Sequence, residues 1–261
     1  ITDVHEAQAG YDLAVAQKIQ AQNAIDDSRE AMRELTGEYI IEFDQLGESM
    51  SLVSPEPQAI EAWTQLSLEQ NLGVIASSHA VEIAQKEVKR QSAGRLPTLD
   101  LVAAETYDSS GGRFGSTKQH GTSIGIELNI PIYSGGLVSS QIRKAHENYN
   151  TAMYSFESAR RSAQRMTREA YLGVIYGISR VKALKQAVVS SEAALEATKV
   201  GFDVGARTAV DLVVSQRTTS EARRNYSQSK YDYIIDTLSL KQAAGNLTPE
   251  DLELINDWLT K

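Results

Sequence analysis

The chain has 261 residues and a formal net charge of −8 at pH 7, from 34 acidic and 26 basic side chains. This acidic balance, without a basic patch that carries interleaved aromatic residues, argues against a nucleic-acid-binding protein. The absence of cysteine excludes a disulfide framework and thiolate metal sites. No apolar run approaches the roughly 18 residues that a transmembrane helix needs.

The first 70 residues predict a long helix and then a less regular segment. Residues 1–37 contain no proline and only a thin apolar stripe, and Gly37 suits the left-handed position that ends a helix. This segment begins like the interior of a helix, so we expect the chain to be a fragment of a longer protein. Residues 38–58 should be irregular, and a short amphipathic helix should end at Gln70.

A helix over residues 71–95 should lead into a β-hairpin over residues 96–134. The second strand carries a large aliphatic residue at every second position, which makes one of its faces wholly apolar: Ile124, Ile126, Leu128, Ile130 and Ile132. A polar, glycine-rich loop over residues 108–121 is expected between the strands. Each strand then has about ten residues, which is the length that a tilted strand needs to cross a bilayer.

An ordinary hairpin packed on a soluble core is the alternative reading, and by frequency alone it is the commoner one. Two features favour the membrane instead. The rest of the chain reads as long helices that offer little core, and a lone hairpin is marginally stable in water. The hairpin must therefore complete a sheet with copies of itself or with other sequence.

Residues 135–203 predict one helix of unusual length. From about Val138 to Asp203 there is no proline and little glycine, which corresponds to roughly 100 Å of helix. Such a length implies coiled-coil packing, and the many alanines allow helices to approach closely. A tight turn at 204–208 follows, then a returning helix over 209–245 that Thr208 can cap, and a short last helix within 246–261.

Two regularities connect these helices. Residues 3–37 and 211–245 both run from an aspartate to a glycine over the same interval, which suggests that residues 1–37 end a first copy of a repeat. The helices before the hairpin and after the turn, placed end to end, also reach about the length of the long helix. One long helix could therefore lie antiparallel to two shorter ones.

Three stretches carry a resemblance to a known family: Leu96-Pro-Thr-Leu-Asp-Leu101, Pro131-Ile-Tyr-Ser-Gly-Gly136 and Phe202-Asp-Val-Gly-Ala-Arg-Thr-Ala-Val-Asp211. In this order and spacing they resemble the outer-membrane efflux protein family, the TolC-like exit ducts of Gram-negative bacteria. The resemblance covers essentially the whole chain.

The resemblance implies a mainly α fold with a β-hairpin, assembled as a homotrimer. A long α-helical coiled-coil barrel in the periplasm would join a transmembrane β-barrel in the outer membrane, to which residues 96–134 would give two strands and an extracellular loop. Residues 38–70 and 246–261 would form an equatorial belt, and residues 1–37, 71–95, 135–203 and 209–245 the periplasmic helices.

The function implied is that of a passive exit duct of tripartite efflux, including multidrug resistance, or of type I secretion. Its partners would be a periplasmic adaptor protein, an inner-membrane pump or ABC transporter and outer-membrane lipid. The adaptor would meet the tip turn, which consists of Val204, Gly205, Ala206, Arg207 and Thr208. Ile124, Ile126, Leu128, Ile130 and Ile132 would face lipid.

The resemblance also implies a gate at this tip. Asp211 would face the pore, so that three copies form an acidic ring that binds cations when shut. Arg207 would pair with Thr2 and Asp3 on neighbouring helices and latch the closed state. The alternative is that these are solvated charges at a helix end. The chain departs from the TolC-like pattern at Val214, where a second pore aspartate is expected, and at Phe202, where a tyrosine would join the latch.

Neither an enzyme nor a metal or cofactor site is predicted. The four histidines are scattered without ligand spacing, the glycines near residue 112 precede no helix, and no nucleophile lies in a catalytic pattern. A soluble coiled-coil structural or appendage subunit is the rival hypothesis. Such a subunit gives no reason for a strand with an unbroken aliphatic face.

Overall fold

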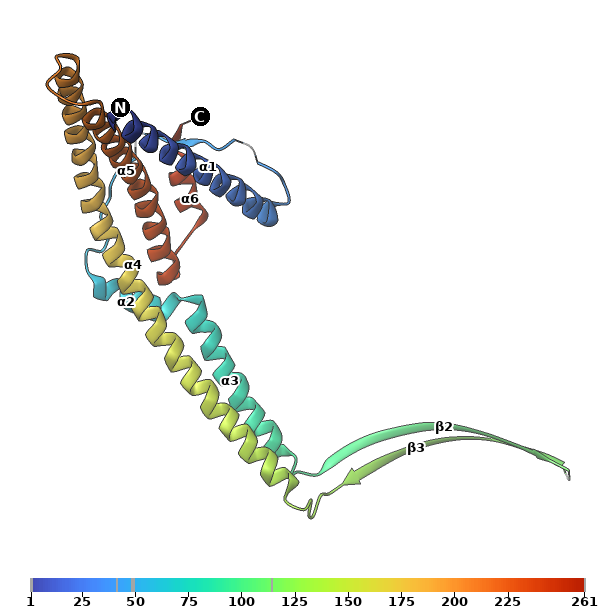
Figure 1. Cartoon of the computed structure of the whole chain (residues 1–261). Coiled ribbons are helices and arrows are strands. Elements are labelled where there is room, and N and C mark those ends of the chain that lie inside the picture. Colours follow the sequence, from blue (N-terminus) through green and yellow to red (C-terminus); the bar gives the residue numbers. More distant parts are fainter. Residues whose placement is uncertain (1, 41, 48–49, 114, 261) are drawn as a thin grey trace. The chain divides into compact units, whose positions relative to one another are not determined.

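The computed structural model describes residues 2–40, 42–47, 50–113 and 115–260, which form long helices and one long β-hairpin (Figure 1). The helices are α1 (Thr2–Thr36), α2 (Ile60–Gln70), α3 (Leu72–Ala93), α4 (Leu137–Asp203), α5 (Ala209–Ala244) and α6 (Pro249–Asn256). The strands are β1 (Gln45–Leu46), β2 (Thr98–Gly112), β3 (Gly115–Asn129) and β4 (Leu259–Thr260). In the described part of the chain, no helix combines the length and the apolar character needed to span a bilayer.

The contacts divide the chain into two compact units. Unit 1 comprises Ile1–Asn71 and Ser162–Lys261, and unit 2 comprises Leu72–Arg161. The helix α4 is continuous over 67 residues, so its first part belongs to unit 2 and the rest to unit 1. The long helix expected from the sequence is thereby confirmed as an element.

The hydrophobic core of unit 1 forms where α4 and α5 meet α2 and the segments around β1 and β4. Its buried side chains include Leu46, Trp63, Tyr171, Val174, Val181, Tyr233, Ile234, Leu240 and Ala244. β1 and β4 pair antiparallel, with Leu46 opposite Leu259. The segment after residue 37, expected to be irregular, therefore joins the C-terminus in a small sheet.

A single hydroxyl group ties the segment before α2 to α5. The Oη of Tyr233 donates a hydrogen bond to the carbonyl oxygen of Val53 and accepts one from its backbone N–H, both at 2.9 Å. The Tyr233 side chain is only 2% exposed. Buried polar groups are costly unless they are paired, so this reciprocal pair fixes Val53 against the helix.

The two glycines Gly173 and Gly177 let α4 and α5 approach closely in unit 1. A Cβ placed on Gly177 would lie 3.7 Å from the Cβ of Tyr233, and one on Gly173 would lie 3.0 Å from Oδ2 of Asp236. Further along, Arg180 lies 3.8 Å from Asp232. The paired positions run forward in α4 and backward in α5, so the two helices are antiparallel.

In unit 2, α3 runs beside the first part of α4 (Figure 1). Small side chains line the surface that the two helices share, among them Ser77 and Ala80 of α3 and Ala152 of α4. Near the hairpin, a Cβ on Gly94 would lie 3.6 Å from Cγ1 of Val138, and Arg95 donates a hydrogen bond to Ser139 at 3.3 Å.

The hairpin of unit 2 is longer than the sequence predicts. β2 and β3 each have 15 residues and pair without interruption from Thr98 opposite Asn129 to Gly112 opposite Gly115. The prediction of a loop over residues 108–121 is therefore wrong. Serine, threonine and glycine predominate there, and they fit a paired ribbon whose backbone hydrogen bonds do not depend on side-chain character.

Candidate functional site

The turn between α4 and α5 is closed by backbone hydrogen bonds that converge on the last turn of α4. The carbonyl oxygen of Gly201 accepts from the N–H of Ala206 at 2.7 Å and of Arg207 at 3.1 Å. Gly205 has a φ of 73°, a left-handed conformation that other residues rarely adopt. The five predicted tip residues, 204–208, thus form an exposed, tightly hydrogen-bonded corner.

Arg207 crosses this corner over Gly201, a residue that the sequence analysis did not identify as part of the tip. A Cβ on Gly201 would lie 2.8 Å from Cγ of Arg207, which is too close for a real contact. The aliphatic part of Arg207 therefore lies directly on the end of α4. The sequence contains a signal for this contact, because a glycine in the last turn of a long helix is less stable than alanine and indicates that space is needed there.

Asp211 and Thr208 form a capping box at the start of α5. The N–H of Thr208 donates to Oδ2 of Asp211 at 3.0 Å, and the N–H of Asp211 donates to Oγ1 of Thr208 at 3.1 Å. The backbone bond from Thr208 is the main reason that the pKa of Asp211 lies below its usual value, and Arg207 contributes in the same direction. Thr208 is confirmed as the helix cap, and Asp211 is an ionised group held at a fixed place.

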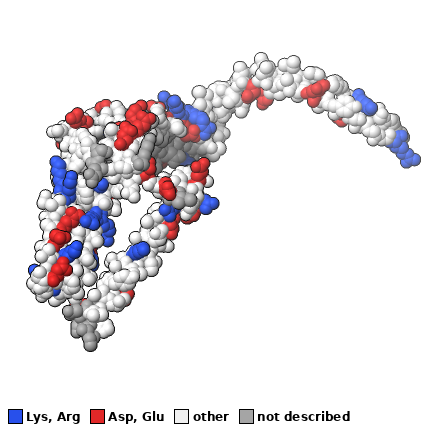
Figure 2. All heavy atoms as spheres, turned by 90° about the horizontal axis from the view of Figure 1, so that it is seen from above, with Lys and Arg blue, Asp and Glu red and all other residues white. Residues whose placement is uncertain are grey.

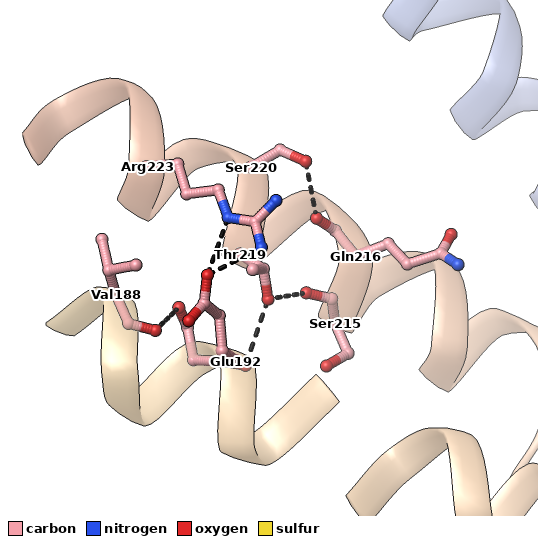
Figure 3. A network of polar contacts seen from close by, with 8 residues as sticks. Val188, Glu192, Ser215, Gln216, Thr219, Ser220 and Arg223 are labelled. Carbon is pink, nitrogen blue, oxygen red and sulfur yellow. Dashed lines mark hydrogen bonds and ion pairs between the residues drawn. The ribbon is translucent and has the colours of Figure 1, made fainter. Parts of the chain in front are cut away.

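The antiparallel pair of α4 and α5 is also joined by polar contacts a few helical turns away from this corner (Figure 3). Arg223 reaches Oε1 of Glu192 through two nitrogens, at 2.9 and 2.7 Å. Thr219, only 2% exposed, donates to the carbonyl oxygens of Ser191 on α4 and Ser215 on α5, at 3.1 and 3.0 Å. The buried hydroxyl of Thr219 bonds α5 to α4 directly, and the exposed ion pair of Arg223 with Glu192 spans the same two helices.

The predicted latch is only partly described. Phe202 lies in the last turn of α4, is 39% exposed, and its carbonyl oxygen accepts from the N–H of Gly205 at 2.9 Å. The backbone of Thr2 and Asp3 starts α1, but their side chains lie outside the described residues. The contact of Arg207 with these two residues stays a prediction.

Val214 lies on the side of α5 that faces α1. The two helices border a groove of about 670 Å³, which Val214 lines together with Tyr11, Leu13, Val213 and Arg217. A Cβ on Gly10 of α1 would lie 3.4 Å from Cγ1 of Val213 on α5. The position of Val214 relative to a pore stays a prediction.

The predicted lipid-facing residues form an exposed aliphatic surface on the hairpin. Ile124, Ile126, Leu128, Ile130 and Ile132 are 76, 74, 59, 56 and 95% exposed. The register sets Leu99 opposite Leu128 and Leu101 opposite Ile126, and opposed residues share a face. We call this surface the aliphatic face. Leu99 and Leu101 are themselves 69 and 77% exposed.

The opposite face of the same ribbon is polar and acidic. Asp100 is opposite Glu127, and Asp108 is opposite Gln119, so all of these belong to that face. The ribbon thus has one apolar and one acidic face, and both faces are open. Elsewhere, the described residues hold no group of three or more His, Cys, Asp or Glu side chains that could bind a metal ion.

These features agree with a known family. The family described as outer membrane efflux protein matches residues 63–246. The chain belongs to the outer membrane efflux protein family. That match includes both described features, the tip between α4 and α5 and the two-faced hairpin.

Other members of the outer membrane efflux protein family cover nearly all of the chain. The outer membrane protein TolC of Escherichia coli is 32% identical over 272 residues, which cover 100% of this chain and 55% of TolC. The alkaline protease secretion protein AprF of Pseudomonas aeruginosa is 30% identical over 257 residues, covering 97% of this chain and 53% of AprF. The chain spans about half the length of the curated relatives it matches.

Solved structures of outer membrane efflux proteins have the same fold. The crystal structure of VceC from Vibrio cholerae has a TM-score of 0.74 and covers 94% of this chain and 58% of VceC, at 19% identity. At this identity the likeness concerns the fold alone. The prediction of a mainly helical chain with a β-hairpin, of the type found in outer-membrane channels, is confirmed.

Proposed function

We propose that the chain is the larger part of an outer-membrane exit duct, a passive channel that serves efflux or type I secretion. The aliphatic face of β2 and β3 is the observation that carries this proposal. Three opposed rows of apolar residues, from Leu99 and Leu128 to Ala103 and Ile124, are open on a hairpin whose described residues are all exposed. Lipid is the medium that removes such a surface from water.

The acidic face of the hairpin supports the other half of the proposal. Carboxylates at Asp100 and Glu127 need water, so the ribbon must close around an aqueous lumen when its other face contacts lipid. A two-stranded ribbon cannot close alone. We therefore infer a homotrimer in which the remaining strands come from further copies and further sequence, as a single β-barrel.

The helices supply a periplasmic extension of that barrel, a hollow coiled-coil cylinder. Residues 38–70 and 246–261, which join in the sheet of β1 and β4, make its equatorial belt. The names of the relatives support the transport role, since one is an outer membrane protein and another a protease secretion protein. A periplasmic adaptor docks on the tip turn, residues 204–208, and an inner-membrane pump or ABC transporter supplies the energy.

The tip also contains the gate. The capping box holds Asp211 ionised at the start of α5, and three such carboxylates around one axis would repel each other and attract cations. Because Val214 replaces a second acidic residue, we expect weaker cation block than a double ring gives. Arg207 latches the closed state with Thr2 and Asp3, and Phe202 cannot add a hydroxyl bond to that latch.

The membrane proposal is tested by placing a charge on either face of β3. Ile126 and Gly125 are adjacent, point to opposite faces, and both lie in the open. Arginine on a lipid-facing position near the bilayer centre costs about 2–4 kcal/mol, and much less on the lumen side. We expect Ile126→Arg to lower the equilibrium constant for folding of the full-length protein into phospholipid vesicles at least 30-fold. Gly125→Arg should leave this constant nearly unchanged.

Equal effects of the two substitutions would contradict a lipid-facing side. A soluble coiled-coil subunit, the rival function, would not enter vesicles at all and would tolerate both changes. The latch is tested separately by single-channel conductance in planar bilayers. Arg207→Ser should raise the conductance of the closed channel, and an unchanged conductance would count against the latch.

A further inference from the structure

The hairpin separates its charges by face. The basic side chains between residues 98 and 129 are Arg113, in the turn, and Lys118, opposite Ser109 on the aliphatic face. Three of the four acidic residues, Asp100, Asp108 and Glu127, lie on the other face. Figure 2 shows basic residues toward the far end of the hairpin. Lys118 thus lies beyond the apolar rows on the same side of the ribbon, and Arg113 lies at the end of the hairpin.

The one acidic residue on the aliphatic face is engaged by a histidine. The register sets Glu105 opposite Thr122 and Tyr107 opposite His120. Nε2 of His120 lies 2.9 Å from Oε1 of Glu105, and its ring meets the ring of Tyr107 edge to face, with centroids 6.4 Å apart. Among the residues that the structure describes, neither Arg113 nor Lys118 forms an ion pair. Glu105 is therefore in contact with His120, whereas both basic side chains are without an acidic partner in the described part of the chain.

The position of these residues along the strand matches the depth of lipid headgroups. With about 3.3 Å per residue and a strand tilt near 40°, His120 lies roughly 20 Å above the level of Leu128 in β3, and Lys118 roughly 25 Å. The apolar band of an outer-membrane barrel is about 25 Å tall. On a band that begins at Leu128, Tyr107 and His120 therefore lie just below the outer edge and Lys118 lies at it, from where its flexible side chain reaches the headgroups.

We propose that Tyr107, Lys118 and His120 form a binding rim for anionic, phosphate-bearing lipid headgroups at the outer edge of the aliphatic face. This inference rests on the proposed function, because it needs lipid against that face. Lys118 and Arg113 supply the ammonium and guanidinium groups that phosphate binds. Tyr107 supplies an amphipathic ring at the interface, where such residues anchor. His120 contacts both the carboxylate of Glu105 and the ring of Tyr107.

Two tryptophan probes separate this proposal from the membrane proposal. Ile126→Trp places a fluorophore within the aliphatic face, and Tyr107→Trp places one at the rim. The full-length protein is reconstituted in vesicles of phosphatidylcholine and phosphatidylglycerol, in which one of the two lipids carries brominated acyl chains that quench tryptophan. The ratio of quenching gives the preference of each site for the anionic lipid.

We expect both probes to be quenched, and the rim probe to prefer phosphatidylglycerol about fivefold, which corresponds to one basic side chain near an anionic surface. The decisive variant moves the positive charge of residue 118 to the opposite face and keeps the net charge of the protein the same. Lys118→Gln combined with Gln119→Lys keeps the net charge but transfers the basic group to the opposite face. The preference at the rim should then fall to near one.

The outcomes are distinct. A preference that survives the exchange of residues 118 and 119 would overturn the rim and leave only general attraction between charged protein and charged lipid. A rim probe without any preference would overturn it as well, while quenching of the Ile126→Trp probe would leave the membrane proposal standing. If brominated lipid quenches neither probe, the proposed function itself fails.

Discussion

Asp211 and Thr208 exchange two hydrogen bonds across the first turn of α5, at 3.0 and 3.1 Å. The residue that we propose as the pore charge is therefore also part of the structure that begins its helix. The carboxylate oxygen that satisfies the N–H of Thr208 is Oδ2, so the other oxygen remains available. A cation that pulled both oxygens away would also release the end of the helix.

The first prediction concerns this cap. Thr208→Ala removes the hydroxyl that accepts from the N–H of Asp211, and the loss of a threonine cap costs about 1 kcal/mol. We expect the amides of residues 209–212 to exchange with solvent about fivefold faster in hydrogen-exchange mass spectrometry. Thr218→Ala is the control, because the Thr218 hydroxyl only donates to the carbonyl oxygen of Val214 within the same helix. Equal protection in both variants would mean that the box does not stabilise the tip.

The second prediction compares two glycines that end helices in the left-handed conformation. Gly37 has a φ of 76° and open space around its Cα, whereas a Cβ on Gly245 would overlap the backbone carbonyl of Gln70. Alanine at Gly37 should cost only the conformational strain of about 1–2 kcal/mol. Gly245→Ala should cost at least about 2 kcal/mol more, because two backbones must separate. The midpoints of urea unfolding measure both, and similar midpoints would show that the contact with Gln70 relaxes freely.

The third prediction concerns the hydroxyl of Tyr233. Tyr233→Phe leaves the N–H and the carbonyl oxygen of Val53 without their partner, and we expect a loss of about 1–3 kcal/mol. Urea unfolding should report the loss, and hydrogen exchange at the Val53 amide should accelerate. Tyr176→Phe is the matched control, because the Tyr176 side chain is 67% exposed. If the Val53 amide of Tyr233→Phe exchanges as slowly as in the unchanged protein, the Tyr233 hydroxyl does not hold this segment.

The fourth prediction is a pH dependence that originates at Asp236. Burial between α4 and α5 raises the pKa of this carboxyl above its usual value of 3.8, the charge of Asp232 adds to the effect, and Arg180 opposes it. The native state then binds the proton more tightly than the unfolded state. The stability that this carboxyl contributes is present below pH 3.8 and is lost as the pH rises through the folded pKa.

Asp236→Asn should therefore raise the melting temperature at pH 7 and change it less as the pH falls toward 4. The helical signal in circular dichroism follows unfolding at each pH. Glu196→Gln, on an exposed position of α4, serves as the control and should give the same small change at both pH values. A stabilisation by Asp236→Asn that does not depend on pH would exclude the proposed cause.

Much of this architecture could be predicted because the signals are local. The absence of proline between Val138 and Asp203 predicts α4, glycines at 37 and 245 predict helix ends, and Thr208 predicts a cap, and each of these agrees with the structure. The alternation from Ile124 to Ile132 predicts one apolar face, which the register confirms for β3 up to Asn129.

Other features depend on pairing between distant residues, which composition does not reveal. The polar residues after Asp108 read as a loop, yet they continue the ribbon because β3 offers a partner at every step. Glycine is needed at Gly201 and Gly173 because Arg207 and Asp236 pack against them, from the neighbouring turn and the neighbouring helix. The proximity of Glu105, Tyr107 and His120 likewise depends on the register, which pairs Tyr107 with His120 across the two strands.

The uninterrupted pairing of β2 with β3 limits how this hairpin can change its length during evolution. An insertion of one residue within either strand would exchange the two faces for every residue beyond it, so that carboxylates would enter the aliphatic face and isoleucines the acidic one. An insertion of two residues within a strand would preserve the alternation. An insertion of any length in the bend between Gly112 and Gly115 would preserve it as well. Homologous hairpins should therefore vary freely at their far end and differ by even steps below it.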